Sequence, residues 1–265
     1  MLPLGIIHLI YGLLLFYLFP LPEGISPWPV LVAVVSSIIR TAASIIMVYC
    51  LKREEVSRVI PVVFTYPIFV AIIAVLLLGE TLGYLQWLAI IIVVAGAIIL
   101  SIRQSPFGAT VWLGRSFLLL FGSSLFFALA DITSKYALAY ISFWNMFYLH
   151  VFCLSGIFLL ISLRPQVFRQ LISLERRNWT LALIAFNETL APVASILLFL
   201  ALQSGPVSLV STIVSSRPIF VVIFALILSR FLPGFLVWQP GKGMLALRLM
   251  ATVMIVSGIA IIYLS

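Results

Sequence analysis

Seven charged or polar side chains lie within long runs of apolar residues. They are Arg40, Tyr66, Asp131, Lys135, Asn187, Glu188 and Arg217. An ionisable group at the centre of a lipid bilayer costs about 2.5–3.5 kcal/mol on insertion scales, so such groups usually face a helix-bundle interior or a water-filled cavity. A guanidinium in a cavity could bind an anionic group of a solute through two hydrogen bonds. These side chains are therefore candidates for a solute-binding cavity.

The deepest charges in these apolar runs are Arg40, Glu188 and Arg217. Glu188 and Arg217 belong to consecutive apolar segments joined by the short stretch QSGPVS, which would place them at similar depth. The two could neutralise each other. With Arg40 added, the set carries two positive charges and one negative, which leaves one guanidinium for an anionic or zwitterionic solute.

Other ionisable side chains allow both a structural and a functional interpretation. Asp131 and Lys135 are one helical turn apart, so they could form an ion pair on one helix face or line the cavity. His8 and His150 could form hydrogen bonds between helices or relay protons. If transport is coupled to protons, Glu188 is the first candidate to carry them and Asp131 the second.

The elements that must hold these residues are membrane-spanning helices. Of 265 residues, 64% are hydrophobic and 8% charged, which is far more apolar than a soluble domain. The apolar runs are long enough, at about 1.5 Å per helical residue, to cross a hydrocarbon core of about 30 Å, and they lack the alternation of a β-barrel. The predicted spans are residues 2–20, 29–51, 59–79, 86–102, 117–137, 142–163, 180–203, 208–230 and 247–264. The sequence thus predicts an all-α integral membrane protein with nine transmembrane helices.

Basic residues are distributed unevenly over the predicted loops. Twelve lie in loops on the side of the N-terminus, and none lies in residues 21–28, 80–85, 138–141 or 204–207. By the positive-inside rule, the N-terminus is expected in the cytoplasm and Ser265 outside, in a plasma membrane or bacterial inner membrane. The net charge of +8 then reflects orientation in the bilayer rather than a nucleic-acid partner.

One sequence pattern occurs twice, 151 positions apart. Residues 43–78 and 194–229 are identical at fifteen of 36 positions, including PIFV at 67–70 and at 218–221. An odd number of spans separates the copies, which predicts two helical repeats of inverted topology. Such repeats commonly enclose a solute site near the middle of the membrane, and access alternates as one bundle rocks against the other.

Each copy of the pattern contains a proline, Pro67 in the first and Pro218 in the second. A proline removes a backbone donor and bends a helix. The bend could be purely structural, or the freed carbonyl groups could line a cavity. Tyr66 and Arg217 precede the two prolines, so a symmetric bend would carry two different side chains.

The predicted repeats are residues 1–104, with four spans, and residues 111–265, with five. The spans 2–20 and 142–163 correspond, so the first repeat has no counterpart of 117–137. We therefore expect that a first helix is missing from the first repeat, through truncation, a misplaced start or a genuine nine-span variant.

The most specific motif lies at residues 61–100, PVVFTYPIFVAIIAVLLLGETLGYLQWLAIIIVVAGAIIL. A proline-containing span ending in Leu-Leu-Leu-Gly-Glu, a Leu-Gln-Trp entry and a span with a small residue beside glycine resemble the end of the repeat in EamA-type permeases of the drug/metabolite transporter superfamily. The resemblance implies a ten-helix carrier of small metabolites with a central cavity and both termini in the cytoplasm, an orientation that differs from the one the charges predict. The second half has Ser229 and Arg230 in place of Gly-Glu. Glu80 itself is expected to cap or anchor a loop.

The function predicted from the sequence is secondary-active transport of a small polar or amphipathic metabolite. No motif for ATP binding or for a familiar hydrolase is present, so a proton gradient or solute exchange would supply the energy. We expect no enzyme activity, no cofactor and no metal site, and Cys50 and Cys153 lack metal-ligand spacing. The alternative is a non-transporting membrane scaffold or a transporter remnant, whose charged groups would pair with each other in a dry core.

Overall fold

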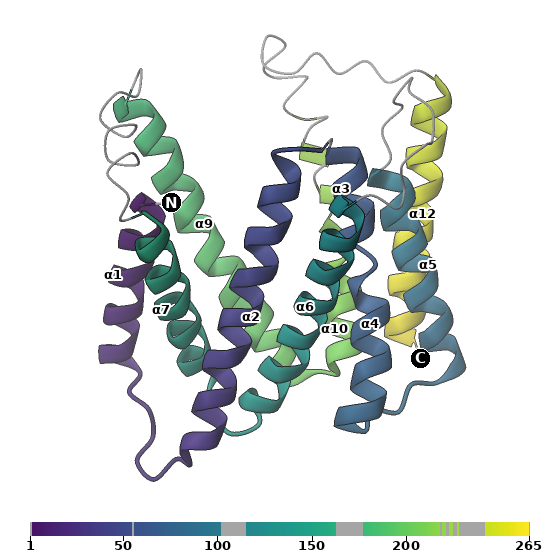
Figure 1. Ribbon diagram of the computed structural model, residues 1–265. Coiled ribbons are helices and arrows are strands. Elements are labelled where there is room, and N and C mark those ends of the chain that lie inside the picture. Colours follow the sequence, from purple (N-terminus) through teal and green to yellow (C-terminus); the bar gives the residue numbers. More distant parts are fainter. Residues whose placement is uncertain are drawn as a thin grey trace. The chain divides into compact units, whose positions relative to one another are not determined.

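The computed structural model describes residues 2–54, 56–101, 115–162, 177–217, 219–220, 223–224, 227 and 242–264. All secondary structure within these ranges is helical (Figure 1), which confirms the predicted fold class at this level. The helices are α1 (Leu2–Leu18), α2 (Pro27–Leu51), α3 (Val56–Val63), α4 (Tyr66–Ile73), the π-helix η1 (Ala74–Leu78), α5 (Tyr84–Ser101), α6 (Arg115–Leu138), α7 (Phe143–Ser162), α9 (Arg177–Ser204), α10 (Val207–Val214) and α12 (Lys242–Leu264).

The helices begin and end close to the spans predicted from the apolar runs. The predicted span 29–51 is α2, and the predicted span 180–203 is α9. Within the described ranges, four helical segments are long and apolar enough to cross a membrane, namely Pro27–Leu51, Ser116–Leu138, Phe143–Ser162 and Ala185–Ser204. Shorter apolar helices accompany them. The total of nine spans and the inverted topology stay predictions.

The chain forms two compact units, and each contains residues from both halves of the sequence. Unit 1 consists of Met1–Ala42 and Ala130–Gly205, and unit 2 consists of Ala43–Leu129 and Pro206–Ser265. The chain therefore passes from one unit to the other within α2, within α6 and at the peptide between Gly205 and Pro206. The predicted repeats, 1–104 and 111–265, are continuous stretches of sequence, whereas each unit combines two separate stretches. The repeats stay a prediction.

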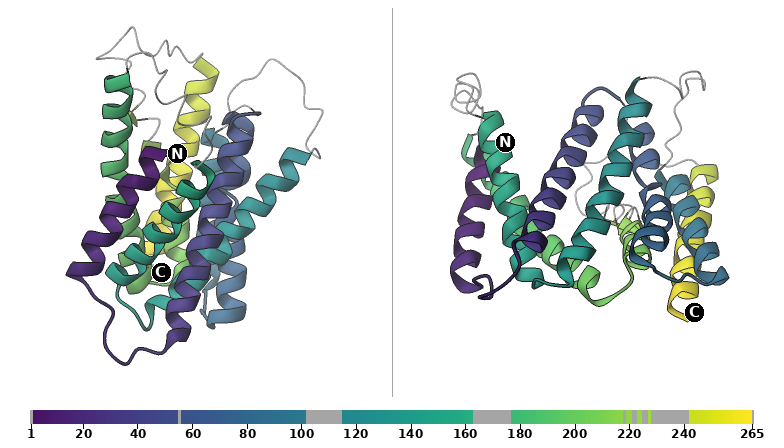
Figure 2. Two further views of the ribbon diagram at one scale, coloured as in Figure 1. Left: turned by 60° about the vertical axis from the view of Figure 1, so that its left-hand side comes forward. Right: turned by 60° about the horizontal axis from the view of Figure 1, so that its bottom comes forward.

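In unit 1, α1 lies along α7, and α9 packs against both (Figures 1 and 2). Two glycines of α1 make the contact with α7 close. A Cβ atom at Gly5 would lie 2.9 Å from Leu159 Cγ, and one at Gly12 would lie 2.9 Å from Phe152 Cδ1. Ser155 Oγ also donates a hydrogen bond to the Gly5 carbonyl at 2.7 Å. Small residues and hydroxyl groups are common at contacts between membrane helices, because they let the backbones approach.

In unit 2, α5 and α12 lie side by side, as both figures of the whole chain show. Glycines again allow the approach. A Cβ atom at Gly258 would lie 2.5 Å from Val93 Cγ2, and one at Gly96 would lie 2.8 Å from Ile255 Cγ1. The two glycines have the same place in the matching segments VAGAII and VSGIAI. Each half of the sequence thus contributes one of the two packed surfaces.

The span predicted at 59–79 is interrupted, and the interruption recurs in the second half. α3 ends at Val63 and α4 begins at Tyr66. α10 begins and ends 151 residues after α3, and turn residues 215–216 follow it. The spacing of the sequence pattern is therefore also the spacing of the break.

The hydrogen bonds around the two breaks match as well. The N–H of Ile68 donates to the Thr65 carbonyl at 3.1 Å, and the N–H of Ile219 donates to the Ser216 carbonyl at 2.9 Å. Pro67 lies in the first turn of α4, where its missing N–H leaves no intrahelical bond unmade. The helix therefore breaks before this proline instead of bending at it. Pro218 lies outside the described residues.

Candidate functional site

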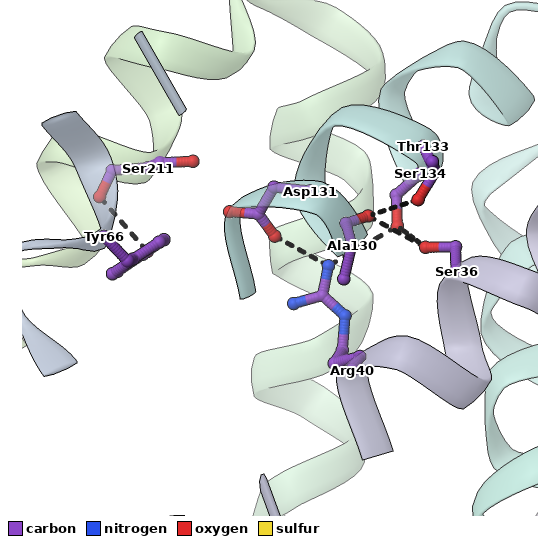
Figure 3. A network of polar contacts seen from close by, with 8 residues as sticks. All are labelled: Ser36, Arg40, Tyr66, Ala130, Asp131, Thr133, Ser134 and Ser211. Carbon is purple, nitrogen blue, oxygen red and sulfur yellow. Dashed lines mark hydrogen bonds and ion pairs between the residues drawn. The ribbon is translucent and has the colours of Figure 1, made fainter. Parts of the chain in front are cut away.

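The candidate site of unit 1 is built around an ion pair between Arg40 of α2 and Asp131 of α6 (Figure 3). Nη2 of Arg40 donates a hydrogen bond to Oδ1 of Asp131 at 2.6 Å. The two side chains are only 12% and 2% exposed. Because a buried charge is costly unless it is paired, each group requires the other. The structure thus brings together two of the predicted cavity residues from distant parts of the sequence.

Hydroxyl groups extend this ion pair into a directed chain (Figure 3). Ser36 Oγ donates to the Ala130 carbonyl at 2.8 Å, so the hydrogen in its 2.7 Å contact with Ser134 Oγ must come from Ser134. Ser134 Oγ in turn lies 3.4 Å from Nη2 of Arg40, which donates to it. Hydrogen bonds that point one way polarise one another. The network therefore holds the guanidinium group in one orientation.

An aromatic ring of α9 completes the surroundings of Arg40. The Phe199 ring centroid is 5.7 Å from Cζ of Arg40, within the range of a cation–π contact. His150 of α7 meets the same ring edge-on, with centroids 5.7 Å apart. Four helices of unit 1 therefore contribute polar or aromatic side chains to this region.

A second buried acidic group, Glu188 of α9, lies beside His8 of α1. Oε2 of Glu188 is 3.7 Å from Nδ1 of His8, and both side chains are buried. Oε1 of Glu188 accepts a hydrogen bond from Nδ2 of the exposed Asn187 at 3.1 Å. The neutralisation of Glu188 by Arg217 stays a prediction, because Arg217 belongs to unit 2.

Lys135 of α6 binds the C-terminal end of α9. Its Nζ donates to the carbonyl groups of Leu202 and Gly205, both at 2.8 Å. The last carbonyls of a helix lack hydrogen-bond partners and carry partial negative charge. An ammonium group at this end donates the missing hydrogen bonds and offsets the partial charge. Pairing of Lys135 with Asp131 stays a prediction.

In unit 2, Tyr66 and Arg217 follow the two helix breaks at equivalent positions. Tyr66 is buried, and its hydroxyl donates to the Ser211 carbonyl of α10 at 3.2 Å (Figure 3). The Tyr66 ring also lies 6.3 Å from the Phe127 ring. Arg217 is exposed. At the first break, the Tyr66 side chain links α4 to α10 by a hydrogen bond. At the second break, the equivalent side chain, Arg217, is exposed.

Comparison with known proteins finds a family to which part of the chain is similar. Residues 2–102 match the model of the EamA-like transporter family. The match covers less than half of the chain and is consistent with an EamA-type member of the drug/metabolite transporter superfamily. A solved structure described as "Crystal structure of protein" has a TM-score of 0.72 and 16% sequence identity, covering 99% of this chain and 85% of that one, and this likeness concerns the fold alone. No curated protein matches the chain.

The family match confirms the resemblance seen at residues 61–100 and extends it over the first four predicted spans. The match and the four long apolar helices of the described residues are those of a multi-pass membrane protein.

The Gly-Glu pair of the EamA-like segment connects the two halves of the sequence. Gly79 has a φ of 67° and ends η1, which suits a residue without Cβ. Oε1 of Glu80 accepts from the Val207 N–H at 2.6 Å, and Oε2 accepts from the N–H and hydroxyl of Ser208 at 3.3 and 2.5 Å. A carboxylate at a helix N-terminus satisfies free N–H groups and is favoured by the helix dipole. The capping role predicted for Glu80 is therefore observed, and the capped helix is α10.

The sequence predicted the charged residues of unit 1 better than their partners. Ser36 lies one turn before Arg40, and Ser134 lies about one turn after Asp131. Serines on the same helix faces as buried charges are a signal that could have identified both. Phe199 gives no such signal, because aromatic residues are frequent in membrane spans.

Proposed function

We propose that the protein is a secondary-active transporter of a small polar or amphipathic metabolite, in a plasma membrane or bacterial inner membrane. The solute would bind in a cavity near the middle of the membrane, and access to it would alternate between two inverted repeats. The observation that supports this most is the buried pair of Arg40 and Asp131. Charged groups in membrane spans are costly and usually serve solute or ion movement.

The chemistry of this pair favours a zwitterionic or anionic solute. A solute carboxylate could replace Asp131 on the guanidinium fork of Arg40. Asp131 would then be a buried charge without its partner, which is strongly unfavourable. A zwitterion resolves this, because its ammonium group can bind Asp131 while its carboxylate binds Arg40. A purely anionic solute would instead require protonation of Asp131, or binding at the exposed Arg217.

A non-transporting membrane scaffold is the second candidate, and one specific observation favours it. The buried charges are already paired, Arg40 with Asp131 and Glu188 with His8. Pairing in a dry core is what the scaffold interpretation predicts. The two candidates differ in whether any solute competes for these groups.

Thermal unfolding of the purified protein in detergent separates the two candidates. Panels of anionic, zwitterionic, cationic and neutral solutes would be added singly. A solute that binds only the folded state stabilises it by about 2.7 kcal/mol at one hundred times its dissociation constant. We expect the midpoint to rise with a zwitterionic or anionic solute, and active solutes to exchange across proteoliposome membranes.

Variants then locate the binding group. Arg40→Lys keeps the charge but loses the guanidinium fork, so it should weaken the stabilisation by solute. Arg53→Lys is the matched control, because Arg53 is exposed and its Cζ lies 4.3 Å from the centroid of the Tyr49 ring. If no solute class raises the midpoint and none exchanges, the scaffold is correct and transport is refuted.

A further inference from the structure

His8 occupies the middle of a contact among three helices of unit 1. The buried residues of α1 are Gly5, His8 and Gly12, which lie on one face of the helix. The glycines bring α1 against α7, and α9 packs against both helices. An imidazole is therefore held where an apolar side chain would pack at lower cost.

The hydrogen bonds of His8 assign one of its protons. Nδ1 of His8 lies 2.9 Å from the Leu4 carbonyl, which can only accept, so Nδ1 carries a hydrogen. The same nitrogen faces Oε2 of Glu188 at 3.7 Å. Nε2 is then the ring atom that can take up a further proton, and Glu188 provides a second acceptor for one.

We propose that His8 and Glu188 together form the proton-binding site of the carrier. This inference rests on the proposed transport function and names its coupling ion. With a neutral imidazole and an ionised carboxylate the pair carries one negative charge. One proton from water on one side of the membrane makes it neutral, and release of that proton to the other side restores it. No other bond forms or breaks, so the net charge of the pair changes by one for each proton that is bound or released.

Four other ionisable groups of unit 1 bear on this assignment, namely Arg40, Asp131, Tyr148 and His150. His150 of α7 interacts electrostatically with both Arg40 and His8, and its Nδ1 is buried without a hydrogen-bond partner in the described part of the chain. Arg40 is bound to Asp131, and Tyr148 of α7 is buried. His150 is therefore linked electrostatically to both buried pairs of unit 1, and it is the alternative proton acceptor that an experiment must separate from His8 and Glu188.

A purely structural role explains the pair less well than proton binding does. Buried ion pairs are often no more stabilising than apolar residues of similar volume. Histidine is also the side chain whose charge changes most readily near neutral pH. A buried histidine and carboxylate on separate membrane helices combine two kinds of side chain that form proton relays in pumps and transporters.

The test is a pH jump applied to reconstituted protein on a solid-supported membrane, with the proton as the only ligand. Binding of a proton within the bilayer displaces charge and gives a transient current. We expect this current in the unaltered protein and its loss in Glu188→Gln, whose amide has the same shape but binds no proton. Glu23→Gln is the matched control, because Glu23 is exposed between α1 and α2, and its current should be unchanged.

His8→Gln removes one of the two proton acceptors, so the pH dependence of its current should differ from that of the unaltered protein. The proposal is overturned if the unaltered protein gives no current, or if Glu188→Gln keeps the current. In the second case, loss of the current in His150→Gln or Asp131→Asn would show which group binds the proton instead. Thermal unfolding of each variant shows that a lost current does not come from lost folding.

Failure of the proton site and failure of the proposed transport function give different experimental results. A pH-jump current without solute exchange in proteoliposomes would contradict transport and leave the proton site standing. Solute exchange without a pH-jump current would contradict the proton site and leave transport standing.

Discussion

The two compact units differ in the acidic and basic groups that they bury. Among the described side chains, the buried acidic and basic groups all belong to unit 1, and they are His8, Asp131, His150 and Glu188. The described acidic and basic side chains of unit 2 are half-buried or exposed, as for Glu80 and Arg217. Charge in a membrane span is costly, so its concentration in one unit points to where the chemistry of the protein takes place.

Both units bury hydroxyl groups, but in the described part of unit 2 these are not accompanied by buried acidic or basic groups. Ser123 Oγ donates to the Ala43 carbonyl at 2.9 Å, and Ser124 Oγ donates to the Val62 carbonyl at 3.0 Å. Such bonds satisfy buried polar atoms without placing charge in the bilayer. Together with the contact of α5 and α12, they make unit 2 a packing element. We therefore expect substitutions in unit 1 to act through charge and substitutions in unit 2 to act through volume.

The largest effect on stability is expected from breaking the ion pair of unit 1. Asp131→Ala leaves the Arg40 guanidinium buried without its carboxylate, which should lower the free energy of unfolding by about 3–5 kcal/mol. The double variant Arg40→Met with Asp131→Leu removes both charges and should recover most of that loss. Denaturation in detergent measures both. A double variant no more stable than the single one would show that charge is not what makes unit 1 sensitive.

A smaller loss is expected from added volume in unit 2. Gly258→Ala places a methyl group 2.5 Å from Val93 Cγ2 in the contact of α5 with α12, which should cost about 1–3 kcal/mol. Gly122→Ala on α6 is the matched control, because no atom lies within 4 Å of its Cβ position. The same denaturation experiment compares them. Equal stability of the two variants would remove the packing role assigned to unit 2.

The smallest of these effects is expected at the helix cap formed by Glu80. Glu80→Ala leaves the N–H groups of Val207 and Ser208 without their carboxylate, for an expected loss of about 0.5–2 kcal/mol. Ser208→Ala removes one of the three contacts and should cost less. Hydrogen exchange of α10 is the direct measurement. Unchanged protection of α10 in Glu80→Ala would contradict the cap.

The elements of the fold were predictable where the cause is local. Apolar runs placed α2 and α9 within a few residues, because the cost of exposing backbone groups to lipid requires a continuous helix. The 151-residue spacing of the sequence pattern also gave the spacing of the break after α3 and α10. What the prolines did not reveal is that the helix stops before Pro67, since a proline is equally suited to a bend and to a first turn.

The partners within the candidate site depend on packing between distant helices. Asp131 and Lys135 are one turn apart, so local spacing suggested that they pair. The structure shows Asp131 with Arg40, ninety-one residues away, and Lys135 at the end of α9. Likewise, Glu188 is beside His8, from the other end of the chain. Spacing along one helix says nothing about which other helix lies against it.

The central claim is that charge in unit 1, rather than packing in unit 2, carries the transport function. Exchange of a stabilising solute in proteoliposomes, at equal amounts of folded protein, tests it with Asp131→Asn from unit 1 and Ser124→Ala from unit 2. We predict that Asp131→Asn slows exchange by about tenfold or more, which corresponds to about 1.4 kcal/mol in the barrier, and that Ser124→Ala leaves it nearly unchanged. Equal exchange in the two variants, or a greater loss in Ser124→Ala, would contradict the claim.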